Sequence, residues 1–293
     1  MNLIIGSHVS FNSSTQLLGS VNEALSYNAN TFMFYTGSTQ STKRCNINDD
    51  ITKQAHELMR DNNILSSNVI VHAPYIINLA NRIDADKTKF YINFFIEEIN
   101  RVKKLGFNKI VLHPGSAVNC TKEEGILNLI KGLNEVIDKT SDVIILIEYM
   151  AGKGHEIGSN IDELKSIIDG INNKDRVGVC LDSCHMNDSG IDLSLFDKFL
   201  DEFDLKIGIN KIKCFHLNDS MNDISSHKDR HANIGYGTIG FNNLINIVNN
   251  KRLNNIPFIL ETPYVNKKTD NEFPPYKYEI ENIRKNKFID FIQ

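Results

Sequence analysis

The sequence predicts an α/β protein built as one closed barrel of eight strand–helix units, and three observations support this. Short apolar runs recur along the chain and number eight. Segments with helical spacing of apolar residues lie between them. The length of 293 residues suits such a barrel, which takes about 250 residues or more, and no linker or low-complexity tract divides the chain. We therefore expect a single domain over residues 1–293.

The candidate strands are continuous apolar runs rather than alternating ones, which is typical of parallel strands buried on both faces. They are Leu3–Ile5, Thr31–Tyr35, Val69–Val71, Lys109–Leu112, Val143–Ile147, Val177–Leu181, Ile212–Phe215 and Pro257–Leu260.

Helical patterns follow these runs. The segment Thr121-Lys122-Glu123-Glu124 has the form of a capping box and opens a helix after the fourth strand. Gly106 is a candidate C-cap of the preceding helix, and Tyr278–Ile289 is expected to form the closing one. Other apolar faces are formed by Leu17, Val21 and Leu25; Ile51, Ala55, Leu58 and Met59; Phe90, Phe94, Val102 and Leu105; Leu164, Ile167 and Ile168; Phe196, Phe199, Leu200 and Phe203; Leu244, Ile245 and Val248. Eight such units favour a closed TIM barrel over a doubly wound open sheet, which is the alternative.

Composition and charge exclude several classes of protein. The longest apolar run, Val143–Ile147, is far shorter than the roughly 20 residues of a membrane helix. The N-terminus has no basic region or cleavage site, and the five cysteines show no zinc-ribbon spacing, so we expect a cytoplasmic protein with reduced thiols. A net charge of −4 argues against DNA binding through a large basic surface, although bound metal ions could supply local positive charge.

Ionisable side chains follow seven of the eight candidate strands. They are His8, His72, His113, Glu148, Asp182 with His185 three residues later, His216 and Glu261. In a barrel all of them would face the C-terminal mouth, where active sites lie. Any one alone could be a structural histidine or a helix cap, but burying so many together without a cation would be costly. Imidazoles with carboxylates suit zinc, with manganese or iron as alternatives.

A second candidate cluster lies in the long polar stretch from Leu217 to Gly240. Asp229 and His231 are two residues apart there, and in an extended segment they would point to the same side. They could chelate one further ion with a ligand from elsewhere. A polar surface loop with turn glycines is the alternative interpretation.

Four segments together resemble the endonuclease IV family of apurinic/apyrimidinic endonucleases, over nearly the whole chain. They are His72-Ala73-Pro74-Tyr75 with Ile77-Asn78-Leu79-Ala80, Glu148-Tyr149-Met150-Ala151-Gly152-Lys153-Gly154, Gly178-Val179-Cys180-Leu181-Asp182-Ser183-Cys184-His185, and the run from Ser226 to Gly240. The resemblance implies hydrolysis of the phosphodiester 5′ to an abasic site in double-stranded DNA, with a 3′-hydroxyl and a 5′-deoxyribose phosphate as products. It also implies cleaning of blocked 3′ ends and a monomeric enzyme.

The resemblance further implies three zinc ions per chain and nine ligands. His72, His113 and Glu148 would hold the first ion. Glu148 would bridge to the second, which Asp182, His216 and Glu261 would complete. The third would be held by His185, Asp229 and His231. Glu148 would thus be the central catalytic residue, while Tyr75 and Gln40 would contact DNA.

Some features depart from the family pattern or remain open. The chain has Phe11-Asn12-Ser13-Ser14 where a glycine pair is usual, and His155 where small or polar residues are usual. We expect solvated or structural roles for His56, His155 and His227. A metal-dependent sugar isomerase or epimerase on the same barrel is the main rival, and it would have no use for a third ion. A zinc amidohydrolase would carry a His-x-His pair after the first strand, where His8 stands alone, and an inactive DNA-binding module should lack a ligand.

Overall fold

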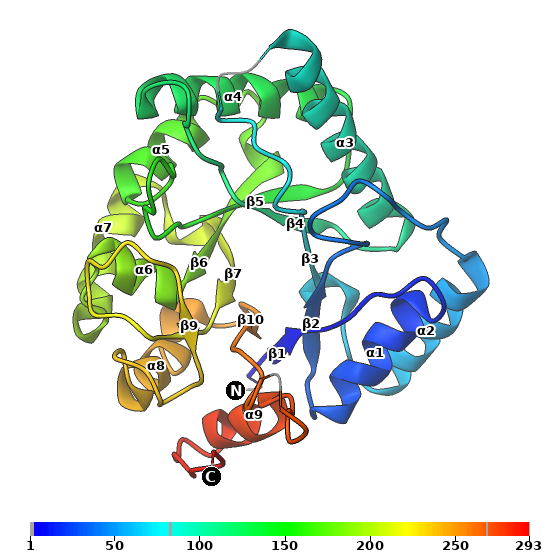
Figure 1. Cartoon of the computed structure of the whole chain (residues 1–293), viewed down its shortest axis with the longest axis vertical. Coiled ribbons are helices and arrows are strands. Elements are labelled where there is room, and N and C mark those ends of the chain that lie inside the picture. Colours follow the sequence, from blue (N-terminus) through cyan, green and yellow to red (C-terminus); the bar gives the residue numbers. More distant parts are fainter. Residues whose placement is uncertain (1–2, 82–83, 268, 293) are drawn as a thin grey trace.

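The computed structural model describes residues 3–81, 84–267 and 269–292 and is a closed barrel of eight parallel strands (Figure 1). The strands neighbour one another in the order β1-β10-β7-β6-β5-β4-β3-β2. They are β1 (Ile5–His8), β2 (Thr31–Phe34), β3 (Ile70–His72), β4 (Lys109–Leu112), β5 (Ile144–Glu148), β6 (Val177–Asp182), β7 (Ile212–His216) and β10 (Phe258–Leu260). Two short strands, β8 (Asp219–Ser220) and β9 (His231–Ala232), form a separate antiparallel pair. The predicted fold class is confirmed, and the open sheet is excluded.

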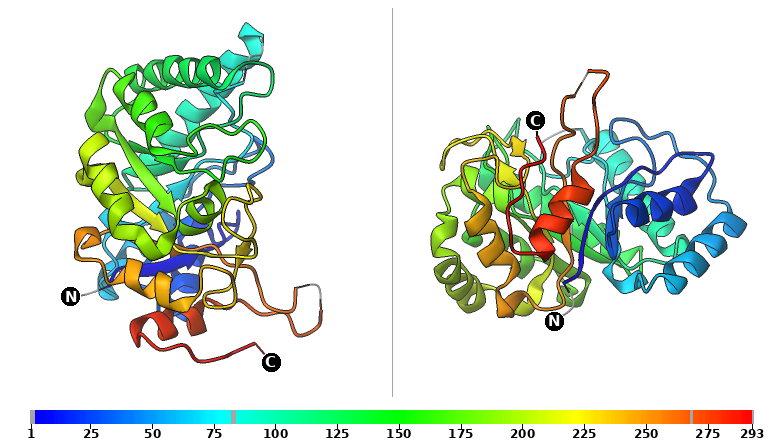
Figure 2. Two further views of the ribbon diagram at one scale, coloured as in Figure 1. Left: turned by 90° about the vertical axis from the view of Figure 1, so that its left-hand side faces the viewer. Right: turned by 90° about the horizontal axis from the view of Figure 1, so that it is seen from below.

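Helices surround the strands, as the turned views of Figure 2 show. They are α1 (Gln16–Ser26), α2 (Asp49–Asp61), α3 (Ala85–Lys104), α4 (Lys122–Asp138), α5 (Ile161–Asp169), α6 (Ser183–Ser189), α7 (Phe196–Lys206), α8 (Phe241–Val248) and α9 (Tyr276–Arg284). Short 3-10 turns are η1 (Ser66–Asn68), η2 (Lys174–Arg176), η3 (Leu193–Leu195), η4 (Ile209–Lys211) and η5 (Lys251–Leu253). Among the described residues, no helix has the length and apolar character needed to cross a bilayer.

Local signals placed two helix ends correctly. Thr121 accepts a hydrogen bond from the Glu124 backbone and completes the predicted capping box of α4. Gly106 follows α3 with a φ of +82°, a left-handed conformation that glycine adopts without a Cβ penalty. The closing helix was predicted too far along the chain, because α9 ends at Arg284 and Asn286 turns to a φ of +48°.

Strand β1 is the clearest error among the predicted strands, since it runs over Ile5–His8 rather than Leu3–Ile5. Gly6 and Ser7 lack the apolar character by which the strand was sought. At Gly6 a Cβ would lie 1.8 Å from the carbonyl oxygen of Thr31 in β2, so only glycine permits this approach of the two strands. The strand therefore continues as far as His8.

The barrel interior contains a closed apolar layer to which seven strands contribute one residue each. The layer consists of Met33, Ile70, Val111, Leu146, Cys180, Cys214 and Ile259. A second and larger apolar core lies between the strands and the surrounding helices. Because side chains alternate along a strand, the residue two positions beyond each layer member also points inward, but at the C-terminal mouth.

Candidate metal centre

A ring of polar side chains lies next to the apolar layer, at the C-terminal mouth of the barrel. Its members are the inward-pointing residues two positions further along the strands. Seven of its members are strand-end residues that the sequence singled out, namely His8, His72, His113, Glu148, Asp182, His216 and Glu261. The remaining position is the residue after β2, and it carries Tyr35. The strand register therefore brings residues that are far apart in sequence to one end of the barrel.

Glu148 lies at the centre of this ring and is fully buried. Its Oε2 atom is 3.2 Å from Nε2 of His72 and 3.1 Å from Nε2 of His113. Its Oε1 atom is 3.0 Å from Nδ1 of His216, which in turn lies 3.1 Å from Oε2 of Glu261. The two carboxylate oxygens thus face two separate groups of potential ligands. These are His72, His113 and Glu148 on one side, and Glu148, Asp182, His216 and Glu261 on the other.

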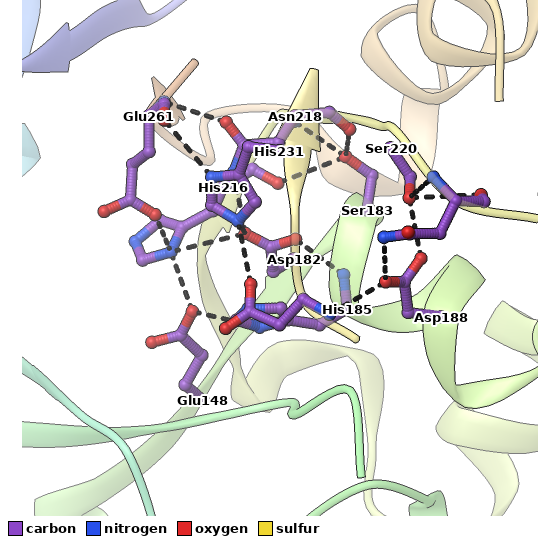
Figure 3. A network of polar contacts seen from close by, with 12 residues as sticks. Glu148, Asp182, Ser183, His185, Asp188, His216, Asn218, Ser220, His231 and Glu261 are labelled. Atoms are coloured by element: carbon purple, nitrogen blue, oxygen red, sulfur yellow. Dashed lines mark hydrogen bonds and ion pairs between the residues drawn. The ribbon is translucent and has the colours of Figure 1, made fainter. Parts of the chain in front are cut away.

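A third group joins α6 to the long loop between β8 and β9. Oδ1 of Asp229 lies 3.1 Å from Nε2 of His185 and 3.5 Å from Nε2 of His231. Asp182, which the sequence assigned to the second group only, also approaches this third group, with Oδ2 3.8 Å from Nε2 of His231. All nine residues of the predicted ligand set therefore lie in one connected cluster, part of which is shown in Figure 3.

Hydrogen bonds on the far side of three imidazoles determine which ring nitrogen faces the cluster. Nδ1 of His72 lies 2.7 Å from the Ala73 carbonyl oxygen, and Nδ1 of His185 lies 2.9 Å from that of Tyr149. Nδ1 of His231 is 3.2 Å from the carbonyl oxygen of Glu261. Each Nδ1 is thereby assigned the proton, since a carbonyl can only accept, so in the neutral ring the lone pair of Nε2 faces a carboxylate.

Lone pairs facing carboxylate oxygens repel unless a cation lies between them. Ligands about 2.0–2.1 Å from a tetrahedral zinc ion are about 3.3 Å apart, close to the separations found here. Nε2 of His231 is buried and makes no hydrogen bond in the described part of the chain, which also fits a ligand position. The residues present therefore suit divalent metal ions. In known metal sites the nitrogen of a histidine that does not bind the ion donates a hydrogen bond, which orients the ring, and the imidazole–carbonyl bonds here have that form.

The electrostatics of the cluster also fit bound cations. Burial alone would raise the pKa of Glu148, but the imidazoles of His113 and His216 hold it well below its ordinary value. Burial also opposes a charge on His185, yet Asp182 and Asp229 raise its pKa well above the usual range. The same carboxylates that would hold metal ions therefore favour protons on these histidines. Metal ions and protons must then compete for the same atoms.

Buried groups outside the predicted set hold these residues in place. Asn218 donates from Nδ2 to Oδ2 of Asp182 at 2.7 Å and accepts the backbone N–H of Glu261 at 2.8 Å. Asp188 accepts the backbone N–H of Asp229 at 2.9 Å. It also accepts the hydroxyl of Ser220 at 2.7 Å (Figure 3). Neither residue is at a strand end, so the sequence criterion missed both. For Asn218, its position two residues after His216 was the available signal.

Cysteines also approach the cluster, which the sequence did not suggest. Cys184 groups with Asp229 and His231, and Cys180 and Cys214 lie beneath His216. Burial raises the pKa of the Cys184 thiol, so this group stays protonated and is a poor metal ligand.

The predicted DNA-contact residues lie apart from the ligand atoms. Tyr75 is 53% exposed, and its ring centroid is 5.0 Å from that of His113 and 5.8 Å from that of His72. Gln40 is exposed on the segment after β2, which is tied to α3 by an ion pair of 2.6 Å between Arg44 and Glu98.

The histidines left out of the ligand set have other surroundings. His155 is exposed. His56 contacts the carbonyl oxygen of Leu105, and His227 that of Ala151.

Known proteins with similar sequences agree with one another in fold and in name. A family model described as a xylose isomerase-like TIM barrel matches residues 21–286. The chain is 48% identical to "Probable endonuclease 4" of Mycoplasma mycoides subsp. mycoides, over 96% of both chains. It is 47% identical to the protein of the same name from Staphylococcus saprophyticus, over 98% of this chain and 96% of that one.

Solved structures share the fold. Endonuclease IV from Thermus thermophilus superposes with a TM-score of 0.81 at 24% identity, over 96% of this chain and 97% of the other. A D-tagatose 3-epimerase-like protein gives a TM-score of 0.67 at 20% identity, over 96% of both chains. At these identities the superpositions show the barrel architecture alone.

Proposed function

This chain belongs to the endonuclease IV family of xylose isomerase-like TIM barrels, and we propose that it is a metal-dependent DNA-repair endonuclease. It would hydrolyse the phosphodiester 5′ to an abasic site, leaving a 3′-hydroxyl and a 5′-deoxyribose phosphate, and would also remove blocked 3′ ends. One observation carries the proposal. The two oxygens of buried Glu148 face separate groups of ligand atoms, an arrangement that suits a carboxylate shared by two ions.

We assign three ions to the cluster. His72, His113 and Glu148 would hold the first, with Glu148 shared by the second. Asp182, His216 and Glu261 would complete the second, and His185, Asp229 and His231 would hold the third. Zinc fits the mixture of imidazole and carboxylate, with manganese or iron as an alternative at one site. When bound, such ions activate water and stabilise charge on a phosphoryl group and its leaving oxygen.

The protein's own side chains fix the geometry and the local charge. Four carboxylates only partly offset three dications, so the mouth would be positive although the chain carries a net charge of −4. Five of the nine proposed ligands are buried and the other four are only partly exposed, so the target would have to leave the DNA stack to reach them. Exposed Tyr75 is suited to filling the gap in the duplex, and Gln40 to probing the adjoining backbone or bases. We expect a monomer acting on double-stranded DNA.

The rival function, a sugar isomerase or epimerase, shares the barrel and the strand-end ligands. It gives no account of Asp229, which the loop brings to 3.1 Å from His185. An isomerase would use a pair of metal ions, whereas we assign three to the cluster here.

The decisive experiment is incision of a duplex that carries one tetrahydrofuran abasic analogue. We expect a single cut on its 5′ side, abolished by chelator and restored by zinc, with the intact duplex as control. A zinc-loaded, folded enzyme that left the analogue uncut would contradict the proposal. Turnover of a ketose sugar by the same preparation would favour the rival.

A further inference from the structure

His216 faces the cluster of proposed ligands through a different ring nitrogen from three of the other histidines. His72, His185 and His231 direct Nε2 at the cluster and have Nδ1 against a backbone carbonyl oxygen. In His216 it is Nδ1 that lies 3.0 Å from Oε1 of Glu148. The Nε2 atom of His216 is on the opposite side of its ring, so a backbone carbonyl does not orient this imidazole from Nδ1. Another group must hold it.

Two cysteines lie against the His216 ring. Cys180 and Cys214 are paired on the neighbouring strands β6 and β7, and both belong to the apolar layer inside the barrel. Their Sγ atoms and a ring nitrogen of His216 lie within 4.8 Å of one another, and both thiols interact with the imidazole. All three residues are 0% exposed, so solvent does not take the place of the thiols.

The chemistry of the thiols suits the Nε2 atom of His216. This nitrogen is buried and makes no hydrogen bond to an oxygen or nitrogen atom in the described part of the chain. If Nδ1 binds a metal ion, the neutral ring carries its proton on Nε2, and a buried N–H without an acceptor is costly. Sulfur is a weak acceptor, and the Cys180 thiol donates its own proton to the Leu181 carbonyl oxygen at 3.7 Å, which leaves its lone pairs free.

We infer that Cys180 and Cys214 are positioning residues for the metal centre, which accept the Nε2–H of His216 and keep Nδ1 directed at the proposed second ion. This inference rests on the proposed function, because it concerns how one of the proposed ligands is held. Rotation of the ring by half a turn about its Cβ–Cγ bond would exchange Nδ1 for a carbon atom and remove the ligand. The thiol pair would prevent this, in the role that backbone carbonyls have for the other three rings.

Zinc retention during stepwise chelation separates this role from simple packing. The double variant Cys180→Ala, Cys214→Ala removes both acceptors, and we expect it to hold one zinc ion about tenfold less tightly than the wild type. The double variant Cys180→Ser, Cys214→Ser restores an acceptor at each position, so retention should return towards the wild-type value. Val111→Ala is the matched control, because it opens space in the same apolar layer but removes no hydrogen-bonding group. It should lower the melting temperature without loosening one ion.

NMR of the zinc-loaded wild type with ¹⁵N-labelled histidine tests the same contact without a substitution. We expect one imidazole that binds zinc through Nδ1 and carries its proton on Nε2. Absence of such a ring would overturn the positioning role. So would serine and alanine variants that lose zinc equally, or an alanine variant that retains zinc as Val111→Ala does. Incision is a separate readout, because a wild type that shows this ring but leaves abasic duplex uncut would contradict the proposed function and not the thiol contact.

Discussion

The proposed ligands fall into two regions that are held in different ways. The strand-borne region includes Glu148 and His216, whose side chains are 1% and 0% exposed and whose positions follow from the register of the barrel. The loop-borne region consists of Asp229 and His231, which are 29% and 18% exposed. The strand-borne ligands are fixed by backbone hydrogen bonding between strands. The positions of the loop-borne ligands depend instead on neighbouring residues that form hydrogen bonds with the loop.

The loop is held in a strained form. Ser225, His227 and Asp229 alternate along it with φ values of +65°, +53° and +57°. Non-glycine residues adopt such angles at a cost of order 1–3 kcal/mol each, so the surrounding structure must impose them. Asn187 and Asp188 at the end of α6 accept the backbone N–H groups of all three residues. The proposed third metal position would therefore be built at a cost in backbone strain that the strand-borne positions do not share.

The largest effect is expected in the strand-borne region, from Glu148→Gln. The amide keeps the size of the side chain but removes the charge that faces both ligand groups, so we expect turnover to fall by about a thousandfold or more. Binding to abasic duplex should persist. Single-turnover incision and a binding titration measure the two quantities, with Glu135→Gln on the surface of α4, at a partly exposed residue remote from the cluster, as control. A variant that cut at near the wild-type rate would refute the shared-carboxylate role.

A smaller effect, on stability, is expected from Glu279, which forms hydrogen bonds with the chain that follows the loop-borne region. It is fully buried and accepts the backbone N–H of Ile234 at 2.9 Å and the hydroxyl of Thr262 at 2.5 Å. Burial raises its pKa from 4.5 to about 7. The folded state then keeps a proton that the unfolded state loses, so the contribution to stability is full below pH 4.5 and is lost as pH rises to about 7.

That loss is of order 3 kcal/mol in total, since one pKa unit corresponds to about 1.4 kcal/mol. Glu279→Gln imitates the protonated form and cannot titrate. We expect the variant to gain stability relative to wild type between pH 5 and 7.5, measured by urea unfolding at saturating zinc. A stability difference that stayed constant across this range would show that Glu279 does not titrate there.

The sequence predicts the strand-borne ligands more directly than the loop-borne ones. The strand-end criterion found His72, His113, Glu148 and their neighbours because parallel strands bring their ends together whatever the chain between them does. Asp229 and His231 were suggested only by a two-residue spacing and by resemblance to a family. Asp188 and Glu279 could not be found, because their partners are backbone groups of a loop whose path the sequence does not reveal. Strand β1 was misplaced because Gly6 and Ser7 are neither apolar nor β-prone.

Asp188→Ala tests whether the two regions can be separated. It removes acceptors from the Asp229 backbone, the Ser220 hydroxyl and Asn222, but no proposed ligand. We expect about three zinc ions in the wild type and a tenfold to hundredfold weaker hold on one of them in the variant, as for other residues that orient metal ligands. Elemental analysis during stepwise chelation would show this, with exposed Asp192→Ala as control. Simultaneous loss of all the ions would mean that the two regions act as one.

The smallest effect is expected from Tyr75, which covers the strand-borne region without belonging to it. Its ring packs 5.0 Å from His113 while about half of its surface faces solvent. If the exposed half stacks in the duplex, Tyr75→Ala should weaken binding to abasic DNA by about tenfold, because aromatic stacking on a base contributes about 1–3 kcal/mol. Zinc content should not change, since the imidazoles of His72 and His113 stay oriented by their own contacts.

If Tyr75 only packs against those rings, the variant would instead have a lower melting temperature and would lose zinc from the strand-borne region. It would keep the wild-type ratio of affinities for abasic and intact duplex. Exposed Tyr278→Ala on α9 corrects for the loss of a surface aromatic ring. Melting temperature, zinc content and binding to both duplexes, measured on one preparation, therefore show whether Tyr75 recognises the lesion or supports the strand-borne region of proposed ligands.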